Sequence, residues 1–190
     1  MTSKSLTVLI AQADERGLAA SGLACLDRCL PLLATEDDTL RPLWAGLAGG
    51  EEEWAGALAA ARQAMETVPP GDEDAALVRG MLGAAPSDWA VTSLREWADG
   101  CSVTALEVHR RFDMGDCPAE NIERCREGEG EGEPDGVGPL VEGELRRQAQ
   151  VLEILAEPPG GNGLRHALEV STEGRRILRA AVSRRARVTG

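Results

Sequence analysis

The sequence contains no tyrosine and only one phenylalanine, and long apolar runs are absent from it. Strands favour aromatic and β-branched side chains, whereas alanine, leucine, glutamate and arginine are good helix formers. Alanine and leucine together exceed a quarter of the 190 residues. The composition therefore predicts an all-α fold, and no apolar segment approaches the length of a membrane-spanning helix.

Sequence motifs that would identify a chemical activity are also absent. The chain has no phosphate-binding or dinucleotide-binding glycine pattern, no CxxC or HxxxH spacing, and no serine or cysteine in a nucleophile elbow. The sequence alone therefore reveals no activity. It favours a non-enzymatic protein that requires no cofactor.

The chain is acidic, and its charges are unevenly distributed. The formal net charge is −12, yet residues 173–190 hold six arginines and one glutamate. This tail carries +5, so the preceding residues carry −17. The phosphate backbone of a nucleic acid would be repelled by most of such a surface, so nucleic acid is not expected as a general partner. The expected partner is instead a basic protein.

The arginine-rich tail has two interpretations. It either folds against the acidic body or contacts an acidic partner. Ile177, Leu178, Ala181 and Val182 recur among the arginines at helical spacing. One face of the tail therefore has apolar side chains to bury, which favours a helix packed on the body with Arg175, Arg179 and Arg185 near acidic residues.

The N-terminal residues and the cysteines bear on the cellular compartment. The apolar run in the N-terminal stretch is too short for the core of a signal peptide. The sequence therefore predicts a cytoplasmic protein. Five cysteines without an export signal predict reduced thiols. Cys25 and Cys29 share a helical face beside leucines, so they are predicted to be buried side chains rather than half of a metal site.

Apolar residues recur at steps of three and four along most of the chain, which predicts about seven to eight helices. Short connections make consecutive helices antiparallel, so the expected architecture is one domain, 1–190, built as a bundle or stack of helical hairpins. Breaks between helices are predicted at Pro31, Gly49–Gly50, Pro69–Pro70 and 158–163. Residues 85–88 are expected to cap a long helix that reaches Phe112.

Residues 115–139 combine glycine, proline and like charge, which predicts a flexible acidic loop apart from a short turn or helix near 118–124. The spacing of its acidic residues does not match a calcium-binding loop. Mobility is expected over 127–138 in particular. Farther along the chain, ion pairs along a helix surface are predicted among Glu142, Glu144, Arg146 and Arg147.

One group of residues has the chemistry of metal ligands. His109 and Asp113 lie one helical turn apart, and Cys117 and Cys125 follow in the next segment. Zinc accepts such a ligand mix in a tetrahedral shell, so a metal site or an enzyme centred on these four residues is an alternative hypothesis. Catalysis by Glu107 with His109 is disfavoured, because residues two apart point to different faces of a helix.

Three tryptophans lie on apolar stripes and are predicted core residues: Trp44, Trp54 and Trp97. Trp89 falls one position away from its stripe, which predicts exposure and a role in an interface. The predicted partner-binding residues are Trp89, Arg175, Arg176 and Arg179.

The segment 24–33 (ACLDRCLPLL), followed by Asp37–Asp38 and Arg41–Pro42, resembles the opening of a family of bacterial immunity proteins. The shared pattern is a Cys-x-x-Arg-x-Leu-Pro-Leu helix, an acidic turn, an Arg-Pro pair and alanine-rich helices, and it covers about residues 17–112. This resemblance implies an all-helical protein that binds and neutralises a toxin. It carries over no catalytic residue.

The leading hypothesis is thus a protein-binding module with an acidic helical surface and a basic protein partner, without a membrane partner. The alternatives are the metal protein or enzyme described above and a regulatory protein whose arginine tail touches nucleic acid. The sequence does not fix the oligomeric state.

Overall fold

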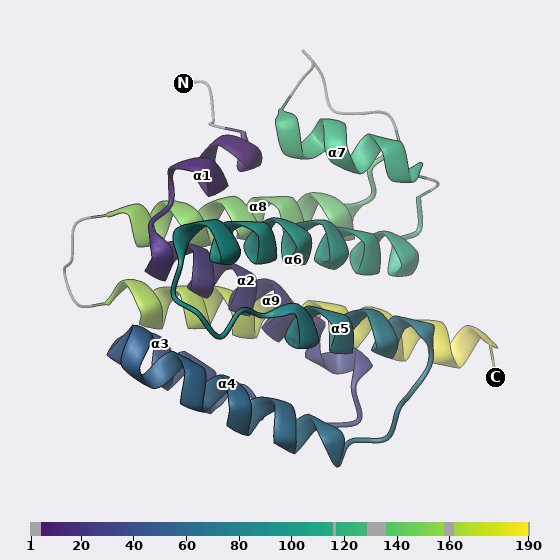
Figure 1. Cartoon of the computed structure of the whole chain (residues 1–190). Helices are drawn as coiled ribbons and strands as arrows, with labels where there is room; N and C mark the ends of the chain where they lie inside the picture. The colour runs from purple at the N-terminus through teal and green to yellow at the C-terminus, as the bar shows by residue number, and fades with distance from the viewer. Residues whose placement is uncertain (1–4, 116, 129–135, 158–161, 190) are drawn as a thin grey trace.

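The computed structural model describes residues 5–115, 117–128, 136–157 and 162–189. Within these ranges the chain forms nine α-helices and one short 3₁₀ helix, with no strand (Figure 1), which confirms the all-α prediction. The helices are α1 (Leu6–Gln12), α2 (Glu15–Cys29), η1 (Leu30–Leu32), α3 (Arg41–Gly49), α4 (Glu51–Glu66), α5 (Glu73–Ala84), α6 (Val91–Phe112), α7 (Ala119–Glu127), α8 (Pro139–Ala156) and α9 (Gly163–Thr189).

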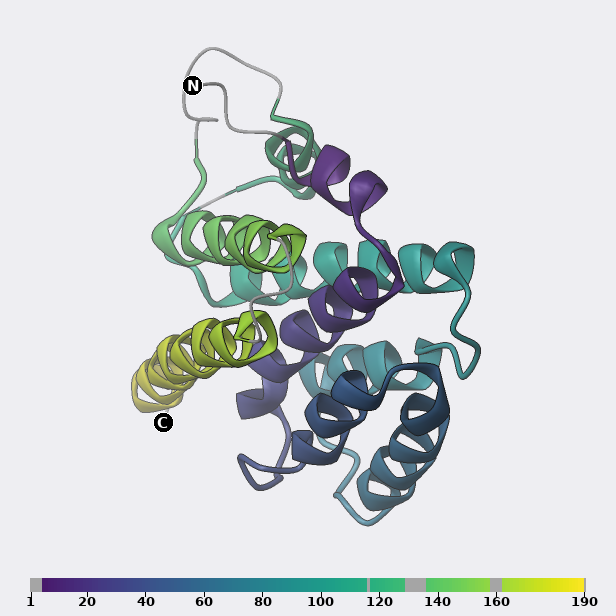
Figure 2. The same cartoon turned by 90° about the vertical axis from the view of Figure 1, so that its left-hand side faces the viewer.

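Helix α2 forms the centre of the bundle. Figure 2 shows it passing between the other helices, and it contacts α3, α5, α6, α8 and α9. Every residue from Gly17 to Cys29 is buried. A helix enclosed on all sides is normally apolar, so any polar side chain on α2 needs a partner within the protein. Asp27 and Arg28 are two such side chains.

The α3–α4 hairpin lies at one edge of the bundle, at the bottom of Figure 1. Gly50 joins the two helices with a φ of +70°, a conformation that L side chains rarely adopt. This turn confirms the break predicted at Gly49–Gly50. Helix α2 likewise ends at Cys29, immediately before the 3₁₀ turn that contains Pro31.

Helices α4 and α5 hold each other's C-terminal ends through one arginine each. The last carbonyls of a helix have no partner within it, and a guanidinium that reaches them satisfies those acceptors. Arg62 of α4 donates to the carbonyls of Leu82, Gly83 and Ala85, and Arg79 of α5 donates to those of Met65, Val68 and Pro69.

Three of the four tryptophans pack together beside α2. Trp54 lies 5.7 Å from Trp89 and 5.8 Å from Trp97 between ring centroids, in edge-on and tilted arrangements. Gly22 of α2 permits the approach of Trp97, since a Cβ on Gly22 would lie 2.7 Å from its ring. Trp44, Trp54 and Trp97 are buried as predicted, whereas Trp89 is half-buried against Trp54 rather than freely exposed.

One predicted helix start needs correction, and one predicted helix is longer than expected. Helix α6 begins at Val91, and Asp88 accepts a hydrogen bond from the Ser93 hydroxyl (2.8 Å) instead of capping the backbone. Residues 119–127 form α7, which confirms the short turn or helix expected near 118–124 and extends it to Glu127, and Ile122 packs on Leu106 of α6 and on α8. Residues 129–135, at the centre of the predicted mobile segment, lie outside the described residues.

Candidate functional site

A fully buried ion pair joins α2 to α8. The Nε and Nη2 atoms of Arg28 donate to the carboxylate of Glu144 at 2.7–3.0 Å, and neither side chain is exposed to solvent. Arg28 also donates to the sulfur of Cys25 at 3.4 Å. Glu144 is therefore not the surface residue that its spacing from Arg147 predicts, because the contact with α2 takes it into the core.

Further polar side chains extend this pair toward the surface. Gln148 donates to Glu144 at 2.9 Å and accepts from the Ser102 hydroxyl at 2.6 Å. Arg126 of α7 donates to Ser102 at 3.2 Å and to the half-buried Asp99. This chain of contacts, which we call the core polar network, ties α2, α6, α7 and α8 together.

His109 lies at the edge of the core polar network. Its Nδ1 is 2.7 Å from the carbonyl of Ala105, so Nδ1 carries the proton. Its buried Nε2 lies 3.5 Å from Glu144 and has no hydrogen-bond partner among the described residues. Burial lowers the pKa of His109, although the Glu144 carboxylate acts to raise it.

The pKa of Glu144 is also lowered. Its burial acts to raise the pKa, but the Arg28 guanidinium, His109 and the hydrogen bonds from Arg28 and Gln148 outweigh that effect. Glu144 is consequently an anion inside the core at neutral pH. Because all of the network except Asp99 at its outer end is buried, its role is to fix the relative positions of the helices that carry the surface.

The core cysteines are inert thiols. Cys25, Cys29 and Cys101 are buried and free, as predicted for the first two. Burial raises the pKa of Cys25 to about 12, and it also raises the pKa values of Cys29 and Cys101. Thiolates are the reactive and metal-binding form, so raised pKa values oppose both uses.

The four residues predicted as metal ligands have separate surroundings. His109 faces Glu144, and Asp113 accepts hydrogen bonds at 3.0 Å from two backbone N–H groups in the first turn of α8. The buried Cys117 thiol donates to the carbonyl of the next residue, while Cys125 is partly exposed. Within the described ranges no three His, Cys, Asp or Glu side chains form a set that could hold a metal ion.

The arginine-rich tail forms the second half of α9 and packs on the body. Arg175 donates to Asp27 at 3.1 Å and to the Asp37 carbonyl, and Arg179 donates to the Asp37 carboxylate, at 3.1 Å for one of the two bonds. Hydrogen bonds from Arg179 hold the pKa of Asp37 below its ordinary value, whereas burial raises the pKa of Asp27. Leu178 between these arginines is fully buried.

This docking confirms the predicted arrangement of the tail, with Ala181 buried and Ile177 and Val182 half-buried. Gly174 lies against the side chain of Arg28, where a Cβ would overlap its methylene groups. Arg176, by contrast, is exposed. Two of the three arginines predicted to bind a partner therefore bind the protein's own acidic residues.

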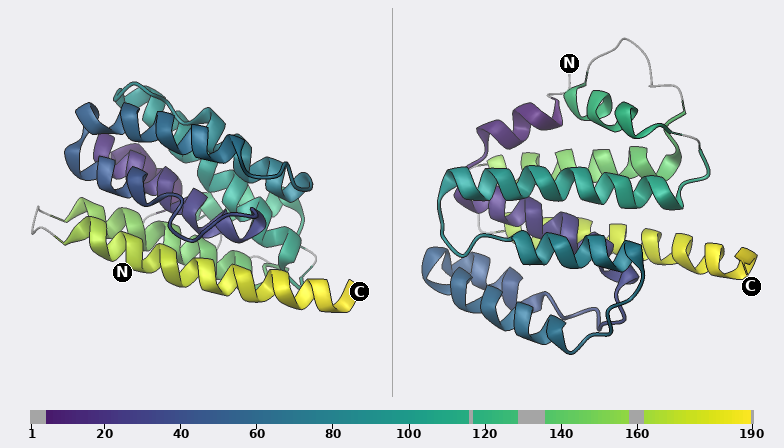
Figure 3. Two further views of the ribbon diagram at one scale, coloured as in Figure 1. Left: turned by 90° about the horizontal axis from the view of Figure 1, so that it is seen from below. Right: turned by 45° about the vertical axis from the view of Figure 1, so that its right-hand side comes forward.

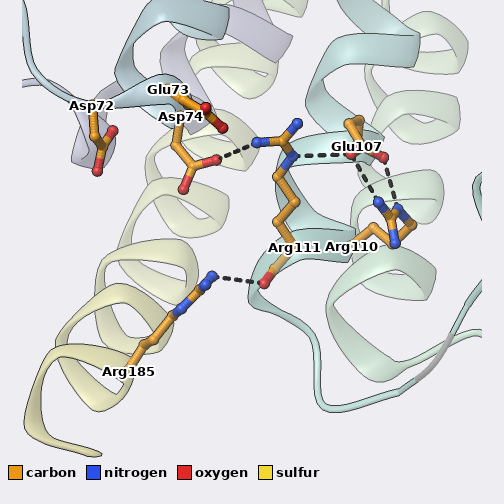
Figure 4. A pocket seen from close by; sticks show the side chains of 7 residues that line it. All are labelled: Asp72, Glu73, Asp74, Glu107, Arg110, Arg111 and Arg185. Atoms are coloured by element: carbon orange, nitrogen blue, oxygen red, sulfur yellow. Dashed lines mark hydrogen bonds and ion pairs between the residues drawn. The ribbon is translucent and has the colours of Figure 1, made fainter. Parts of the chain in front are cut away.

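A charged cleft of about 440 Å³ lies between the start of α5, the end of α6 and the tail (Figure 4). Arg111 spans its middle and bonds to Asp74 and to Glu107, both at 2.9 Å. Hydrogen bonds from Arg110 and Arg111 hold the pKa of Glu107 below its ordinary value. The residues that line the cleft are Asp72, Glu73, Asp74, Glu107, Arg110, Arg111 and Arg185.

Arg185 closes one side of the cleft. It donates to the Arg111 carbonyl at 2.9 Å, and its guanidinium lies 5.0 Å from the centre of the Phe112 ring. Figure 4 shows it reaching from α9 toward the end of α6. The cleft thus presents carboxylates of α5 opposite fixed arginines, an arrangement suited to recognising charged groups of another molecule.

Sequence reasoning missed most of the core polar network. The missed residues are Arg28, Ser102, Arg126, Glu144 and Gln148. One signal was available: Asp27 and Arg28 interrupt an otherwise apolar helical stretch, and a charge at such a position requires a buried partner. The sequence does not say which acidic residue supplies that partner.

Comparison with known proteins gives no match to a protein-family model, to a curated protein or to a solved structure. None of the described helices is both long and apolar enough to cross a membrane.

Proposed function

We propose that this chain is a non-enzymatic binding protein that uses an acidic helical surface to engage a basic protein. The observation that carries the proposal is the pairing of the tail: Arg175 and Arg179 are bound by Asp27 and Asp37 of the same chain. Each such pair neutralises one positive and one negative charge. The excess of −12 therefore remains for the rest of the surface, where a partner can meet it.

Exposed carboxylates on neighbouring helices support this proposal. Glu51, Glu52 and Glu53 are exposed in the first turn of α4, and Asp72 and Glu73 are exposed at the start of α5. Within the described part of the chain none of these five takes part in an ion pair. Unpaired surface carboxylates accelerate association with a basic protein and select against acidic ones.

The resemblance of residues 17–112 to bacterial immunity proteins supports a more specific form, in which the partner is a toxin bound and neutralised in the cytoplasm. Neutralisation by binding needs a rigid surface and no catalytic group. The core polar network provides rigidity, since it fixes four helices through hydrogen-bonded charges.

The test uses the protein encoded beside this chain's gene, produced in a bacterial host alone and together with the chain. We expect the neighbour alone to arrest growth, co-production to restore growth, and the two proteins to co-elute in a complex that weakens as NaCl is raised. Growth arrest that co-production does not relieve, with no complex formed, would contradict the proposal.

A second candidate is contact of the last helical turns with nucleic acid. Figure 3 shows the C-terminal part of α9 projecting beyond the other helices, and Arg184 and Arg187 are exposed there. DNA binding that falls with rising salt and is lost in an Arg184→Ala/Arg187→Ala variant would support this candidate.

A further inference from the structure

An apolar groove of about 320 Å³ runs between α5 and α6, apart from the core polar network. Its floor is apolar, and its α5 wall combines small residues at helical spacing with Leu77 and Met81. The lining residues are Ala76, Leu77, Gly80, Met81, Ala84, Glu96, Trp97, Gly100, Cys101 and Thr104.

Two exposed glycines keep this groove open. Gly80 of α5 and Gly100 of α6 lie inside helices, where glycine costs about 0.5–1 kcal/mol relative to alanine. A Cβ added at either position would meet no atom within 4 Å. Their missing side chains are therefore not required by packing within the described protein, and they leave room for atoms of another molecule.

The groove has a carboxylate at one end and continues at the other toward the charged cleft, where Glu107 is held by Arg110 and Arg111. Glu96 lines one end, and along α6 the same face continues through Gly100 and Thr104 to Glu107 of the charged cleft. Glu73 lines that cleft from α5 and is exposed. From Glu96 to Glu107 the α6 axis advances about 16 Å, or about three helical turns.

We propose that the α5–α6 groove receives an amphipathic helix of the basic partner, and this inference rests on the proposed function. Apolar side chains of that helix, spaced at i, i+3, i+4 and i+7, would enter the groove beside Gly80 and Gly100. Its flanking lysines or arginines would reach Glu96 at one end and Glu73 at the other. A straight apolar seam between two antiparallel helices accepts a third helix by ridge-and-groove packing, whereas an extended peptide would find no strand edge there.

The test measures binding of synthetic fluorescent helices by anisotropy at about 50 mM NaCl. The probe is an amphipathic peptide of about 18 residues with a leucine face and lysine flanks. A scrambled peptide of the same composition, which has no apolar face, reports binding by charge alone. We expect the wild-type protein to prefer the amphipathic peptide by about tenfold or more.

Groove-filling variants locate the site. Gly100→Leu and Gly80→Leu should each weaken binding of the amphipathic peptide by about tenfold. Gly56→Leu is the matched control, because Gly56 is an exposed helical glycine on α4 whose Cβ would also meet nothing within 4 Å. Leucine forms helix better than glycine, so all three variants should melt at or above the wild-type temperature.

Charge reversal tests the ends of the groove. Glu96→Lys should weaken binding of the lysine-flanked peptide about fivefold more than Glu153→Lys, which reverses an exposed charge on α8.

The possible outcomes separate this inference from the proposed function. If the wild-type protein binds neither peptide, the groove inference is overturned, whereas the proposed function is decided by the co-production test. If it binds both peptides equally, or if Gly100→Leu binds as tightly as Gly56→Leu, the proposal that the groove receives a helix is contradicted. The proposal of an acidic binding surface is then unaffected. If the wild-type protein dimerises in sedimentation and Gly100→Leu is monomeric, the occupant is a second copy of this chain and the assigned partner is wrong.

Discussion

Glu144 holds Arg28 in a bidentate contact across 116 positions of the chain, and water reaches neither side chain. Taking two charges out of water costs several kcal/mol for each ion, and only close geometry with further hydrogen bonds offsets that cost. Gln148 and Cys25 supply two of those bonds. Removing one side chain of the Arg28–Glu144 pair should therefore destabilise the protein more than removing both.

We expect Glu144→Leu to lower the free energy of unfolding by about 3–5 kcal/mol, because Arg28 stays buried without its counter-charge. The double variant Arg28→Met/Glu144→Leu should be closer to the wild type than either single variant. Urea unfolding at pH 7 measures all of these values. Glu142→Ala, which removes an exposed pair with Arg146, is the control and should change stability by about 0–1 kcal/mol. Strictly additive losses in the double variant would show that the two charges are not coupled.

Gly174 should be intolerant of even a methyl group. Its α-carbon lies against Arg28, whose guanidinium is fixed by Glu144, so the side chain cannot move aside. We expect Gly174→Ala to lower the melting temperature although alanine favours helix. Gly80→Ala is the matched control, since its Cβ meets nothing within 4 Å, and it should stabilise the protein by about 0.5–1 kcal/mol. A Gly174→Ala protein as stable as Gly80→Ala would mean that α9 can shift away from α2.

The helices themselves were predictable because their signals are local. Apolar spacing, the Gly49–Gly50 break and the stop before Pro69 depend only on neighbouring residues, and the fold confirms them. The full length of α7 was harder to predict than its presence, because glycine and like charge dominate the average over 115–139, whereas Ile122 alone supplies the apolar contact with Leu106.

The core polar network could not be predicted in the same way. Glu144 and Arg147 have the spacing of a surface pair, and nothing local shows that α2 will cover Glu144. Which face of α8 is buried depends on the packing of helices distant in sequence. The same holds for the α5–α6 groove, which two glycines from different helices line only in the folded protein.

Acid should destabilise the protein first through His109. Its pKa is lower in the folded than in the unfolded state, so the unfolded state binds more protons as the pH falls below about 6.5. Stability present above that pH is lost progressively below it. Glu144, whose folded pKa is also lowered, adds a further loss below about pH 4.5.

We therefore expect His109→Gln to flatten the dependence of unfolding free energy on pH between about 6.5 and 5, measured by urea titration. His166→Gln is the control, since His166 is exposed on α9. Equal slopes for wild type and His109→Gln in this window would show that His109 does not cause the acid sensitivity.

Truncation after Thr172 should lower the melting temperature substantially. It removes the buried Leu178 and Ala181 together with Arg175, which leaves Asp27 buried without its ion-pair partner. Burial of apolar area contributes about 25 cal/mol per Å², whereas exposed ion pairs contribute about 0–1 kcal/mol each. We expect about 0.5 M NaCl to lower the melting temperature of the full chain much less than the truncation does.

Truncation after Ser183 is the matched control, because it removes Arg184, Arg185 and Arg187 but leaves Leu178, Ala181 and the pairs to Asp27 and Asp37. This shorter truncation should lower the melting temperature only slightly. Any decrease should come from loss of the contact between the Arg185 guanidinium and the Phe112 ring. If truncation after Thr172 left the melting temperature unchanged but abolished binding to DNA, the tail would be an interaction arm. Its docking on α2 would then contribute no stability, and the acidic surface would lose the observation on which the proposed function depends.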